Sequence, residues 1–248
     1  MLQQIICMKW GLRYSSSYVN RLYNSILKHT DRKTQLICFT DNKNGINKNI
    51  ICKPIPKINL PKHMETSPWK KLSIWQSPLE PLLGDVLFLD LDLVITGNLD
   101  RFFDYKKDQF CVIENWTQIG LGIGNTSCFR FPVGKYKNIF DDFQKNPELY
   151  FKKYRIEQVY ISKRINSQFF WPKDWCQSFK HNLLPKWPMR IWKPAKLPGK
   201  TSIVAFTGKP DPDEVLEGKW PVPRHQFYKK IYKQLKTPDW LLDNWNIN

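Results

Sequence analysis

The chain has 248 residues, of which 42% are hydrophobic and 15% aromatic, so it can bury a sizeable core and is not a disordered chain. It carries 39 lysines and arginines against 22 aspartates and glutamates, and this net charge of +17 predicts an anionic partner: a nucleic acid, an acidic lipid surface or a phosphorylated substrate. No segment approaches the roughly 18 consecutive apolar residues that a membrane-spanning helix requires.

The first 60 residues are predicted to alternate between strands and a helix. Ile5–Met8 has the apolar character of a strand, and apolar residues from Val19 to Leu27 then recur at helical spacing behind the N-cap candidates Ser15-Ser16-Ser17. Two further short strands are predicted at Leu36–Thr40 and Ile50–Ile55. The segment Met8–Tyr14 therefore joins a strand end to a helix start, a place where open α/β sheets bind ligands.

Six cysteines occur without the C-x-x-C spacing of a zinc site, at positions 7, 38, 52, 111, 128 and 176. The first five lie in or beside apolar, strand-like segments, where a free cysteine acts as a small hydrophobic residue. The N-terminus lacks the basic region and long apolar core of a signal peptide. We therefore expect reduced thiols and a cytoplasmic protein.

Two aspartates, Asp90 and Asp92, interrupt an apolar run from Leu87 to Ile95 that is typical of a buried strand in a parallel sheet. Residues two positions apart lie on the same face of an extended strand, so both carboxylates would point the same way. A buried carboxylate without a partner is costly. The pair therefore predicts a hard divalent cation, Mg²⁺ or Mn²⁺, which takes further oxygen ligands from substrate phosphates. The alternative is that the aspartates end the strand and cap the following turn.

The rest of the chain continues with strands and helices and contains no repeat or linker. A helix is predicted within Pro68–Leu83. Later strands are predicted at Phe110–Ile113, Cys128–Phe131 and Ser202–Phe206, and helices at Lys135–Gln144 and Ile156–Arg164. The segment from Phe169 to Pro198 holds four tryptophans and five prolines, so we expect packing rather than regular structure to order it. We expect one α/β domain over residues 1–248, in which residues 213–248 form a basic, aromatic C-terminal extension.

Several motifs follow one another in a fixed order around the aspartates. They are Lys71-Leu72 with Trp75, then Asp90-Leu91-Asp92, Asn98-Leu99-Asp100-Arg101-Phe102-Phe103, Asn125-Thr126-Ser127, Glu157-Gln158 and Gly208-Lys209. This ordered set resembles the GT-A glycosyltransferases, most closely glycosyltransferase family 8, which includes glycogenin and lipopolysaccharide galactosyltransferases. Ser127 stands at a glycine position of the family pattern, and Glu157 stands at an aspartate position. The resemblance spans roughly residues 5 to 212.

The resemblance implies a GT-A fold, a Rossmann-like α/β architecture with a mostly parallel central sheet flanked by helices. It also implies metal-dependent transfer of a sugar from a nucleotide-diphosphate donor to an acceptor hydroxyl. A UDP-sugar is the expected donor, retention of the anomeric configuration is the expected outcome, and the acceptor would be a glycan, a lipid-linked group or a protein. No nucleic acid partner is expected for this function.

The resemblance further implies roles for individual residues. Asp90 and Asp92 would bind Mn²⁺ or Mg²⁺, and Asp92 would thereby serve catalysis. The diphosphate would meet Lys71, Gly208 and Lys209, and the base pocket would be formed by Lys9, Trp10 and Tyr14. The donor sugar would face Asn125, Ser127, Glu157 and Gln158, with Glu157 and Gln158 as catalytic candidates.

One position departs from the family pattern. The family supplies a third metal ligand from the histidine of H-x-x-G, and Ala205 stands in its place in Ala205-Phe206-Thr207-Gly208. Thr207 or water would then complete the coordination, or metal binding is weakened.

Each candidate also has a purely structural interpretation. Lys71 would belong to an exposed helix face, Glu157 would cap its helix, and Asn125 would be a turn residue. The aromatic residues Trp10, Tyr14 and Trp75 would pack, and Trp75 is expected in the core.

Two other functions fit part of the pattern. The run Asp90–Val94 also matches the first motif of haloacid-dehalogenase-type phosphatases, in which the first aspartate becomes phosphorylated, although three predicted strands precede it here. A basic nucleic-acid-binding module would instead use the lysines and aromatic residues. Finally, the basic, aromatic segment His225–Lys236 predicts peripheral contact with an anionic membrane, or an ordinary C-terminal helix with a lysine face.

Overall fold

The computed structural model describes residues 2–245, in which two units are each built around their own sheet. The first unit comprises Met1–Asn20, Asp31–Leu91 and Asp100–Trp171, and the second comprises Arg21–Thr30, Asp92–Leu99 and Pro172–Asn248. Helix α1 (Ser16–Lys28) begins in the first unit and continues in the second.

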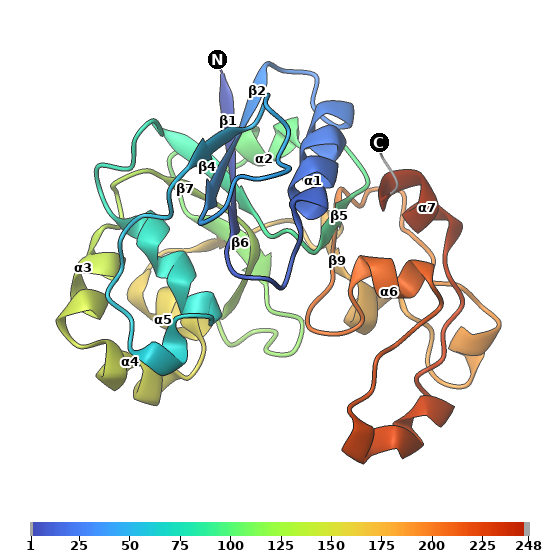
Figure 1. Ribbon diagram of the computed structural model, residues 1–248. Coiled ribbons are helices and arrows are strands. Elements are labelled where there is room, and N and C mark those ends of the chain that lie inside the picture. The colour runs from blue at the N-terminus through green and yellow to red at the C-terminus, as the bar shows by residue number, and fades with distance from the viewer. Residues whose placement is uncertain (1, 246–248) are drawn as a thin grey trace. The chain divides into compact units, whose positions relative to one another are not determined.

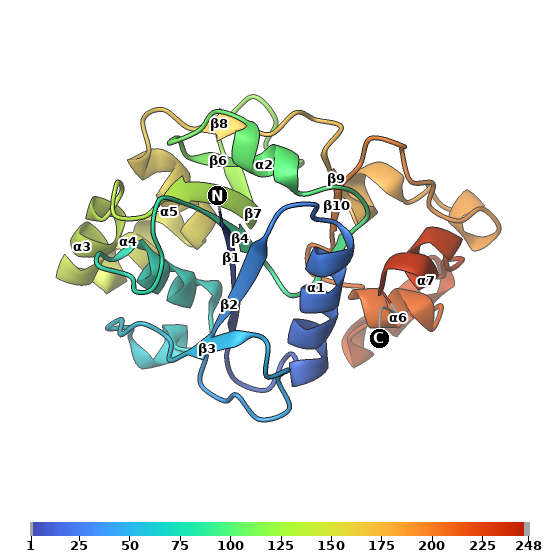
Figure 2. The same ribbon diagram turned by 90° about the horizontal axis from the view of Figure 1, so that it is seen from above.

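A seven-stranded sheet forms the first unit (Figure 1), and the order of its strands is β3-β2-β1-β4-β7-β6-β8 (Figure 2). The strands are β1 (Gln3–Lys9), β2 (Thr34–Thr40), β3 (Ile51–Lys53), β4 (Asp85–Leu89), β6 (Cys111–Glu114), β7 (Gly124–Pro132) and β8 (Phe169–Phe170). Neighbouring strands run parallel except β7, which is antiparallel to both β4 and β6. The predicted α/β architecture with a mostly parallel central sheet is confirmed.

One face of this sheet carries most of the hydrophobic core. Alternate strand residues, such as Ile6, Phe88 and Phe129, are fully buried on it. Four helices cover this face: the 3-10 helix η2 (Pro68–Trp75), α3 (Asn138–Lys145), α4 (Pro147–Tyr154) and α5 (Glu157–Arg164) (Figure 2). Trp75 stacks on Phe129 with ring centroids 5.6 Å apart, which confirms Trp75 as a core residue.

A buried cation, Arg130, lies on the opposite face of β7 and is 0% exposed. Its Nη1 donates to the carbonyl oxygens of Phe102 at 2.6 Å and Phe103 at 3.1 Å, within the short helix α2 (Asp100–Asp104). Its Nε lies 3.3 Å from Oδ2 of Asp85 on β4. Carbonyls in the last turn of a helix have no partner inside the helix, so the guanidinium satisfies them and fixes α2 against the sheet.

A three-stranded sheet forms the core of the second unit, in the order β5-β10-β9. β5 (Leu93–Ile95) is antiparallel to β10 (Ile203–Ala205), and β10 is parallel to β9 (Cys176–Ser178). A π-helical turn, η3 (Phe179–Leu183), follows β9 directly. This unit also contains η4 (Met189–Ile191), α6 (Pro212–Leu216), η5 (Arg224–Ile231) and α7 (Asp239–Trp245).

The aspartate strand differs from its prediction. The apolar run from Leu87 to Ile95 is two strands in two sheets, β4 and β5, joined by a turn at Asp90-Leu91-Asp92. The expectation that both carboxylates share one face of a continuous strand is wrong, because extended geometry ends at Leu89. The alternative, in which the strand ends at the aspartates, is confirmed.

Other elements also differ from the sequence-based expectations. The helix within Pro68–Leu83 is a 3-10 helix, and the short helices α2 and α4 were not predicted. The segment from Phe169 to Pro198 contains β8, β9 and η3 in addition to irregular structure. The last three residues of the predicted C-terminal extension, 246–248, lie outside the described residues.

All six cysteines are free, as expected, and burial raises the pKa of the Cys111 thiol to about 11. Across residues 2–245, no helix combines the length and apolar character needed to cross a membrane. The cytoplasmic location stays a prediction.

Replacing Arg130 with alanine is expected to lower the free energy of unfolding by about 3–5 kcal/mol, because Asp85 and the carbonyls of α2 would lose a buried charged partner. Chemical denaturation followed by circular dichroism measures the effect. Lys107→Ala is the control, since this side chain is 69% exposed and lies 4.0 Å from Asp104. It is expected to change the free energy by less than about 0.5 kcal/mol, and equal effects of both substitutions would contradict the role given to Arg130.

Candidate functional site

The carboxyl end of β4 and the beginning of β7 lie side by side in the first unit. Because β7 runs antiparallel to β4, its first residues are next to the last residues of β4, and the backbone N–H of Asp90 donates to the carbonyl of Ser127 at 2.9 Å. Asn125, 8% exposed, accepts from the backbone N–H of Ser127 at 3.1 Å. The structure thus brings Asp90 together with the predicted Asn125-Thr126-Ser127 segment, and Asn125 does have the local bond of a turn residue.

Lys71 neutralises Asp90. Its ammonium lies 2.7 Å from both carboxylate oxygens of Asp90, 3.5 Å from the carbonyl oxygen of Thr126 and 5.2 Å from the centre of the Phe88 ring. Lys71 is only 7% exposed, so the interpretation of Lys71 as part of an exposed helix face is wrong. A short, partly buried ion pair of this kind fixes the direction in which the aspartate points.

Helix α5 is attached to the same segment through its first two turns. Glu157, 4% exposed, accepts a hydrogen bond from the hydroxyl of Thr126 at 2.9 Å. Ser162 accepts from the backbone N–H of Gly124 at 2.9 Å and donates to the carbonyl of Gln158 at 2.7 Å. Glu157 therefore lies in the first helical turn, as its structural interpretation expected, and also holds Thr126 in place beside Asp90.

A bulge in β7 shapes this segment. The pairing with β6 shifts between Val112, opposite Phe129, and Ile113, opposite Asn125, so the residues between them on β7 leave the regular ladder. Gly124 is required here, because a Cβ on it would lie 2.7 Å from a methyl carbon of Val112. The bulge leaves residues 126–128 without a partner residue on β6, and the carbonyl of Ser127 among them accepts from the backbone N–H of Asp90 at the end of β4.

Asp92 follows Asp90 by two residues, in the turn that leads into β5, and is partly exposed. Two carboxylates offer the hard oxygen atoms that Mg²⁺ and Mn²⁺ prefer. Among residues 2–245, no group of three or more histidine, cysteine, aspartate or glutamate side chains is placed to hold a metal ion. The donor set therefore fits an ion that takes most of its ligands from phosphate and water, and Ala205, fully buried in β10, adds no ligand.

The predicted base-pocket residues occupy three different settings. Lys9 is 7% exposed at the end of β1, and the indole N–H of Trp10 donates to the carbonyl of Thr66 at 3.3 Å. Tyr14 packs on Tyr18 with ring centroids 4.8 Å apart. Trp10 and Tyr14 thus have packing contacts, and their role toward a base stays a prediction.

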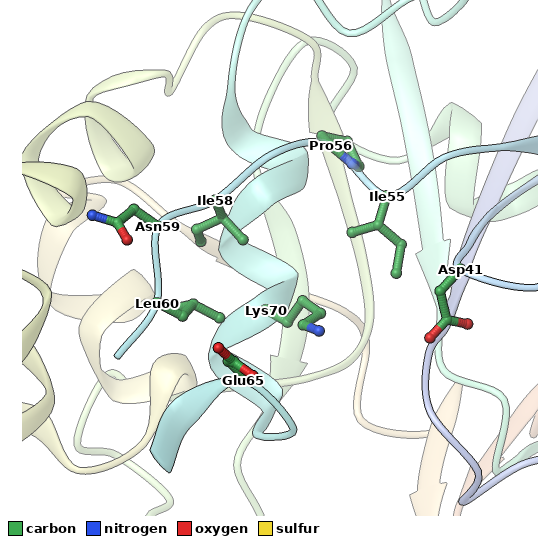
Figure 3. Close-up of a pocket in the computed structure, with 8 residues that line it drawn as sticks. All are labelled: Asp41, Ile55, Pro56, Ile58, Asn59, Leu60, Glu65 and Lys70. Atoms are coloured by element: carbon green, nitrogen blue, oxygen red, sulfur yellow. The ribbon is translucent and has the colours of Figure 1, made fainter. Parts of the chain in front are cut away.

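A cavity of about 460 Å³ lies beside them in the first unit (Figure 3). It is lined by the apolar residues Ile55, Pro56, Ile58 and Leu60 and by the polar residues Asp41, Asn59, Glu65 and Lys70. Figure 3 shows the side chains of Asp41, Ile55 and Lys70 facing a common space. The cavity follows the carboxyl ends of β2 and β3 and borders the 3-10 helix η1 (Lys62–Met64), and sequence reasoning missed it because the loop after β3 has no recognisable motif.

The loop after β1 is connected to this cavity. Gly11, with φ +62°, donates its backbone N–H to Oδ2 of Asp41 at 2.8 Å. The positive φ favours glycine at this position. The loop after β1, which is expected to form the base pocket, therefore contacts Asp41, and Asp41 also lines the cavity.

In the second unit, Lys209 and Gly208 follow β10. The ammonium of Lys209 lies 2.7 Å from Asp211 and 2.5 Å from Glu214, so two carboxylates already neutralise it. Lys180, on η3, was not singled out from the sequence. Its ammonium donates to the carbonyl of Thr207 at 2.9 Å, and burial lowers its pKa. No sequence pattern predicts a π-helical turn, so the sequence did not indicate Lys180 as a candidate site residue.

Comparison with known proteins shows the fold. No protein-family model matches the sequence, and no curated protein matches it. The galactosyltransferase LgtC, solved in complex with donor and acceptor sugar analogs, superposes with a TM-score of 0.59 at 13% identity, over 92% of this chain and 100% of LgtC. The glycosyltransferase GlyE of Streptococcus pneumoniae TIGR4 superposes with a TM-score of 0.56 at 12% identity, over 97% of this chain and 63% of GlyE.

Two further structures extend this comparison. The bifunctional glycosyltransferase WbbM, in its apo form, superposes with a TM-score of 0.57 at 11% identity, over 85% of this chain and 46% of WbbM. A second LgtC structure carries an active-site mutation of glutamine to glutamate. The chain has the GT-A fold of these glycosyltransferases, while membership of glycosyltransferase family 8 stays a prediction.

The ion pair between Lys71 and Asp90 is expected to stabilise the protein beyond the sum of its two members. A double-mutant cycle with Lys71→Met and Asp90→Asn measures this in the free energy of unfolding, and we expect a coupling of about 1–3 kcal/mol. The pair Lys145 and Asp142, 2.8 Å apart with Lys145 74% exposed, serves as the control, with an expected coupling below about 1 kcal/mol. A coupling near zero for Lys71 and Asp90 would contradict the contact.

Proposed function

We propose that this protein transfers a sugar from a nucleotide-diphosphate donor, a UDP-sugar, to an acceptor hydroxyl. The observation that carries the proposal is the cluster of Asp90, Lys71, Thr126 and Glu157 at the carboxyl end of β4, directly before Asp92. The fold supports it, since the LgtC structure with donor and acceptor sugar analogs has the same architecture. Open α/β sheets bind ligands at such strand ends.

The nucleoside is proposed to occupy the cavity beside Asp41. Its apolar walls, Ile55, Ile58 and Leu60, suit the faces of a base, and Asp41, Glu65 and Asn59 offer acceptors and donors for base and ribose. The loop of Lys9, Trp10 and Tyr14 is proposed to close over it.

The diphosphate is proposed to lie by Asp90 and Asp92. A divalent metal ion held there would neutralise the charge that grows on the departing diphosphate. Lys71 orients Asp90 for this task, because both carboxylate oxygens already face its ammonium. Ala205 cannot coordinate the ion, so an oxygen atom of phosphate or water would take the coordination position that a histidine would otherwise fill.

The donor sugar is proposed to face Asn125, Ser127 and Gln158. In the transfer, the bond between the anomeric carbon and the β-phosphate oxygen breaks with its electron pair going to UDP, and the acceptor oxygen bonds to that carbon. Front-side attack with retention fits this site, and the acceptor proton then passes to the departing phosphate oxygen. Glu157 is assigned to positioning through Thr126. Gln158 is proposed to contact the donor, and LgtC also has a glutamine in its active site.

A membrane-facing surface is proposed in the second unit. Residues 186–200 and 218–238 contain eleven lysines and arginines and no acidic residue. The two segments are joined, since Arg190 donates to the carbonyl of Tyr232 at 3.1 Å and accepts from the backbone N–H of Lys236 at 2.9 Å. They expose six large apolar side chains: Trp187, Met189, Trp192, Phe227, Tyr228 and Ile231.

Aromatic side chains among cations, without acids, suit the interface of an anionic bilayer. The sequence predicted this contact from residues 225–236 alone. The aromatic residues of 187–192 extend the surface, and a lipid-linked acceptor would be found there.

UDP with MnCl₂ is expected to raise the melting temperature by about 5 to 10 °C at a hundredfold excess over Kd, because ligand binding stabilises the folded state. Asp92→Asn is expected to abolish the shift. Asp108→Asn is the control, since Asp108 is exposed and asparagine tolerates its φ of +58°. Differential scanning fluorimetry measures the shift, and hydrolysis of a panel of nucleotide-sugars then identifies the donor.

Other outcomes favour the competing functions. Stabilisation by fluoroberyllate but not by UDP would support a phosphatase. Salt-sensitive binding of oligonucleotides that Asp92→Asn leaves unchanged would support a nucleic-acid-binding module.

Vesicles containing phosphatidylserine are expected to bind the protein more tightly than neutral phosphatidylcholine vesicles. A Trp192→Ser, Phe227→Ser, Ile231→Ser triple variant is expected to lose about tenfold or more in affinity, because the apolar contacts with the bilayer disappear. Leu83→Ser is the control, since Leu83 is 82% exposed in the first unit. Flotation assays that find equal binding to both vesicle types would contradict the membrane contact.

A further inference from the structure

One end of the three-stranded sheet in the second unit gathers groups from three strands. Leu93, the first residue of β5, pairs with Ala205, the last residue of β10, and Ala205 pairs with Ser178, the last residue of β9. Because β5 is antiparallel to β10 while β9 is parallel to it, the residue before β5 and the residues after β10 and β9 emerge at the same end. Those residues include Asp92, Thr207-Gly208 and Lys180.

Two lysines at this end differ in their partners. Lys209 is bound by the carboxylates of Asp211 and Glu214. Lys180 donates to the carbonyl of Thr207 and, within residues 2–245, forms no ion pair with a carboxylate. An ammonium has three donors, so Lys180 retains positive charge and hydrogen-bonding capacity for a ligand, whereas the charge of Lys209 is already compensated.

The surroundings of Lys180 are positively charged. Burial lowers the pKa of Lys233, and the neighbouring cations Lys229, Lys180 and Arg190 lower it further. Burial and Lys180 likewise lower the pKa of His181. Cations that disfavour one another's protonation produce a positive potential, which attracts an anion.

The loop after β10 lies beside Lys180. Gly208 has φ +80°, which favours glycine, and a Cβ on it would be in ordinary van der Waals contact with the Lys180 ammonium at 3.8 Å. The hydroxyl of Thr207 is buried and, among the described residues, has no hydrogen-bond partner. A buried hydroxyl without a hydrogen-bond partner destabilises the folded state, unless a bound ligand supplies that partner.

We propose that Lys180, rather than Lys209, supplies the fixed positive charge for the diphosphate of the nucleotide donor, with the Thr207 hydroxyl as a second contact. This inference rests on the proposed function. Lys180 would stabilise the charge that develops on the diphosphate as the bond to the sugar breaks. Lys209 instead stabilises the start of α6 through Asp211 and Glu214, which form the capping box of that helix.

Isothermal titration of UDP and UMP in MnCl₂ tests this assignment on the full-length chain. Lys180→Met is expected to weaken UDP binding by about 10- to 100-fold, since hydrogen bonds to charged groups are lost. The affinity of Lys180→Met for UMP, which lacks the β-phosphate, is expected to change by less than about threefold. Lys180→Gln, which keeps a donor for Thr207 but no charge, is expected to behave like Lys180→Met, and Lys180→Arg is expected to recover part of the affinity.

Lys209→Met is the matched control, and it is expected to change the affinity for UDP by less than about threefold. Unchanged UDP binding by both uncharged Lys180 variants, or an equal loss with Lys209→Met, overturns the assignment of Lys180 and leaves the proposed function standing. An equal loss of UDP and UMP affinity also overturns it, because the effect would then be structural. A wild-type protein that binds no UDP overturns both proposals.

Discussion

The ion pair between Lys71 and Asp90 is the contact on which the candidate site depends. A carboxylate at the end of a buried strand needs a cation or hydrogen-bond donors, and Lys71, itself 7% exposed, lies 2.7 Å from both of its oxygens. The same ammonium approaches the carbonyl of Thr126, whose hydroxyl is held by Glu157. One partly buried pair therefore connects η2, β4, β7 and α5 at the strand end where the diphosphate is proposed to bind.

The lysines considered for the diphosphate differ in the partners that they already have. Lys71 and Lys209 were both expected to meet the diphosphate, yet each is neutralised by carboxylates of its own unit. Positional roles are therefore proposed for both: Lys71 orients Asp90, and Lys209 supports the first turn of α6. Lys180 has a neutral carbonyl as its partner, and it is therefore the lysine proposed to meet the diphosphate. Net charge alone does not distinguish these cases, because the distinction lies in tertiary pairing.

The sequence predicts the order of strands and helices in this fold well but not the places where the chain changes sheet. The run from Leu87 to Ile95 is apolar throughout, so its pattern could not reveal that β4 ends at Leu89 and β5 starts a second sheet. The structure brings the segment 125–127 beside Asp90, whereas the motifs showed only their order along the chain. Lys180 and the cavity beside Asp41 escaped prediction, since a π-helical turn and an irregular loop place them. The buried position of Arg130 likewise depends on carbonyls of α2 that only the folded chain brings near.

Asp90 and Asp92 are proposed to bind together a metal ion that carries the diphosphate of the donor. Crystals grown with MnCl₂ and UDP, measured at the manganese absorption edge, test this claim most directly. We predict an anomalous peak within coordination distance of one carboxylate oxygen from each aspartate and of oxygens from both phosphates. UDP bound with both aspartates turned away from it, or manganese bound elsewhere in the protein, would contradict a metal site at Asp90 and Asp92.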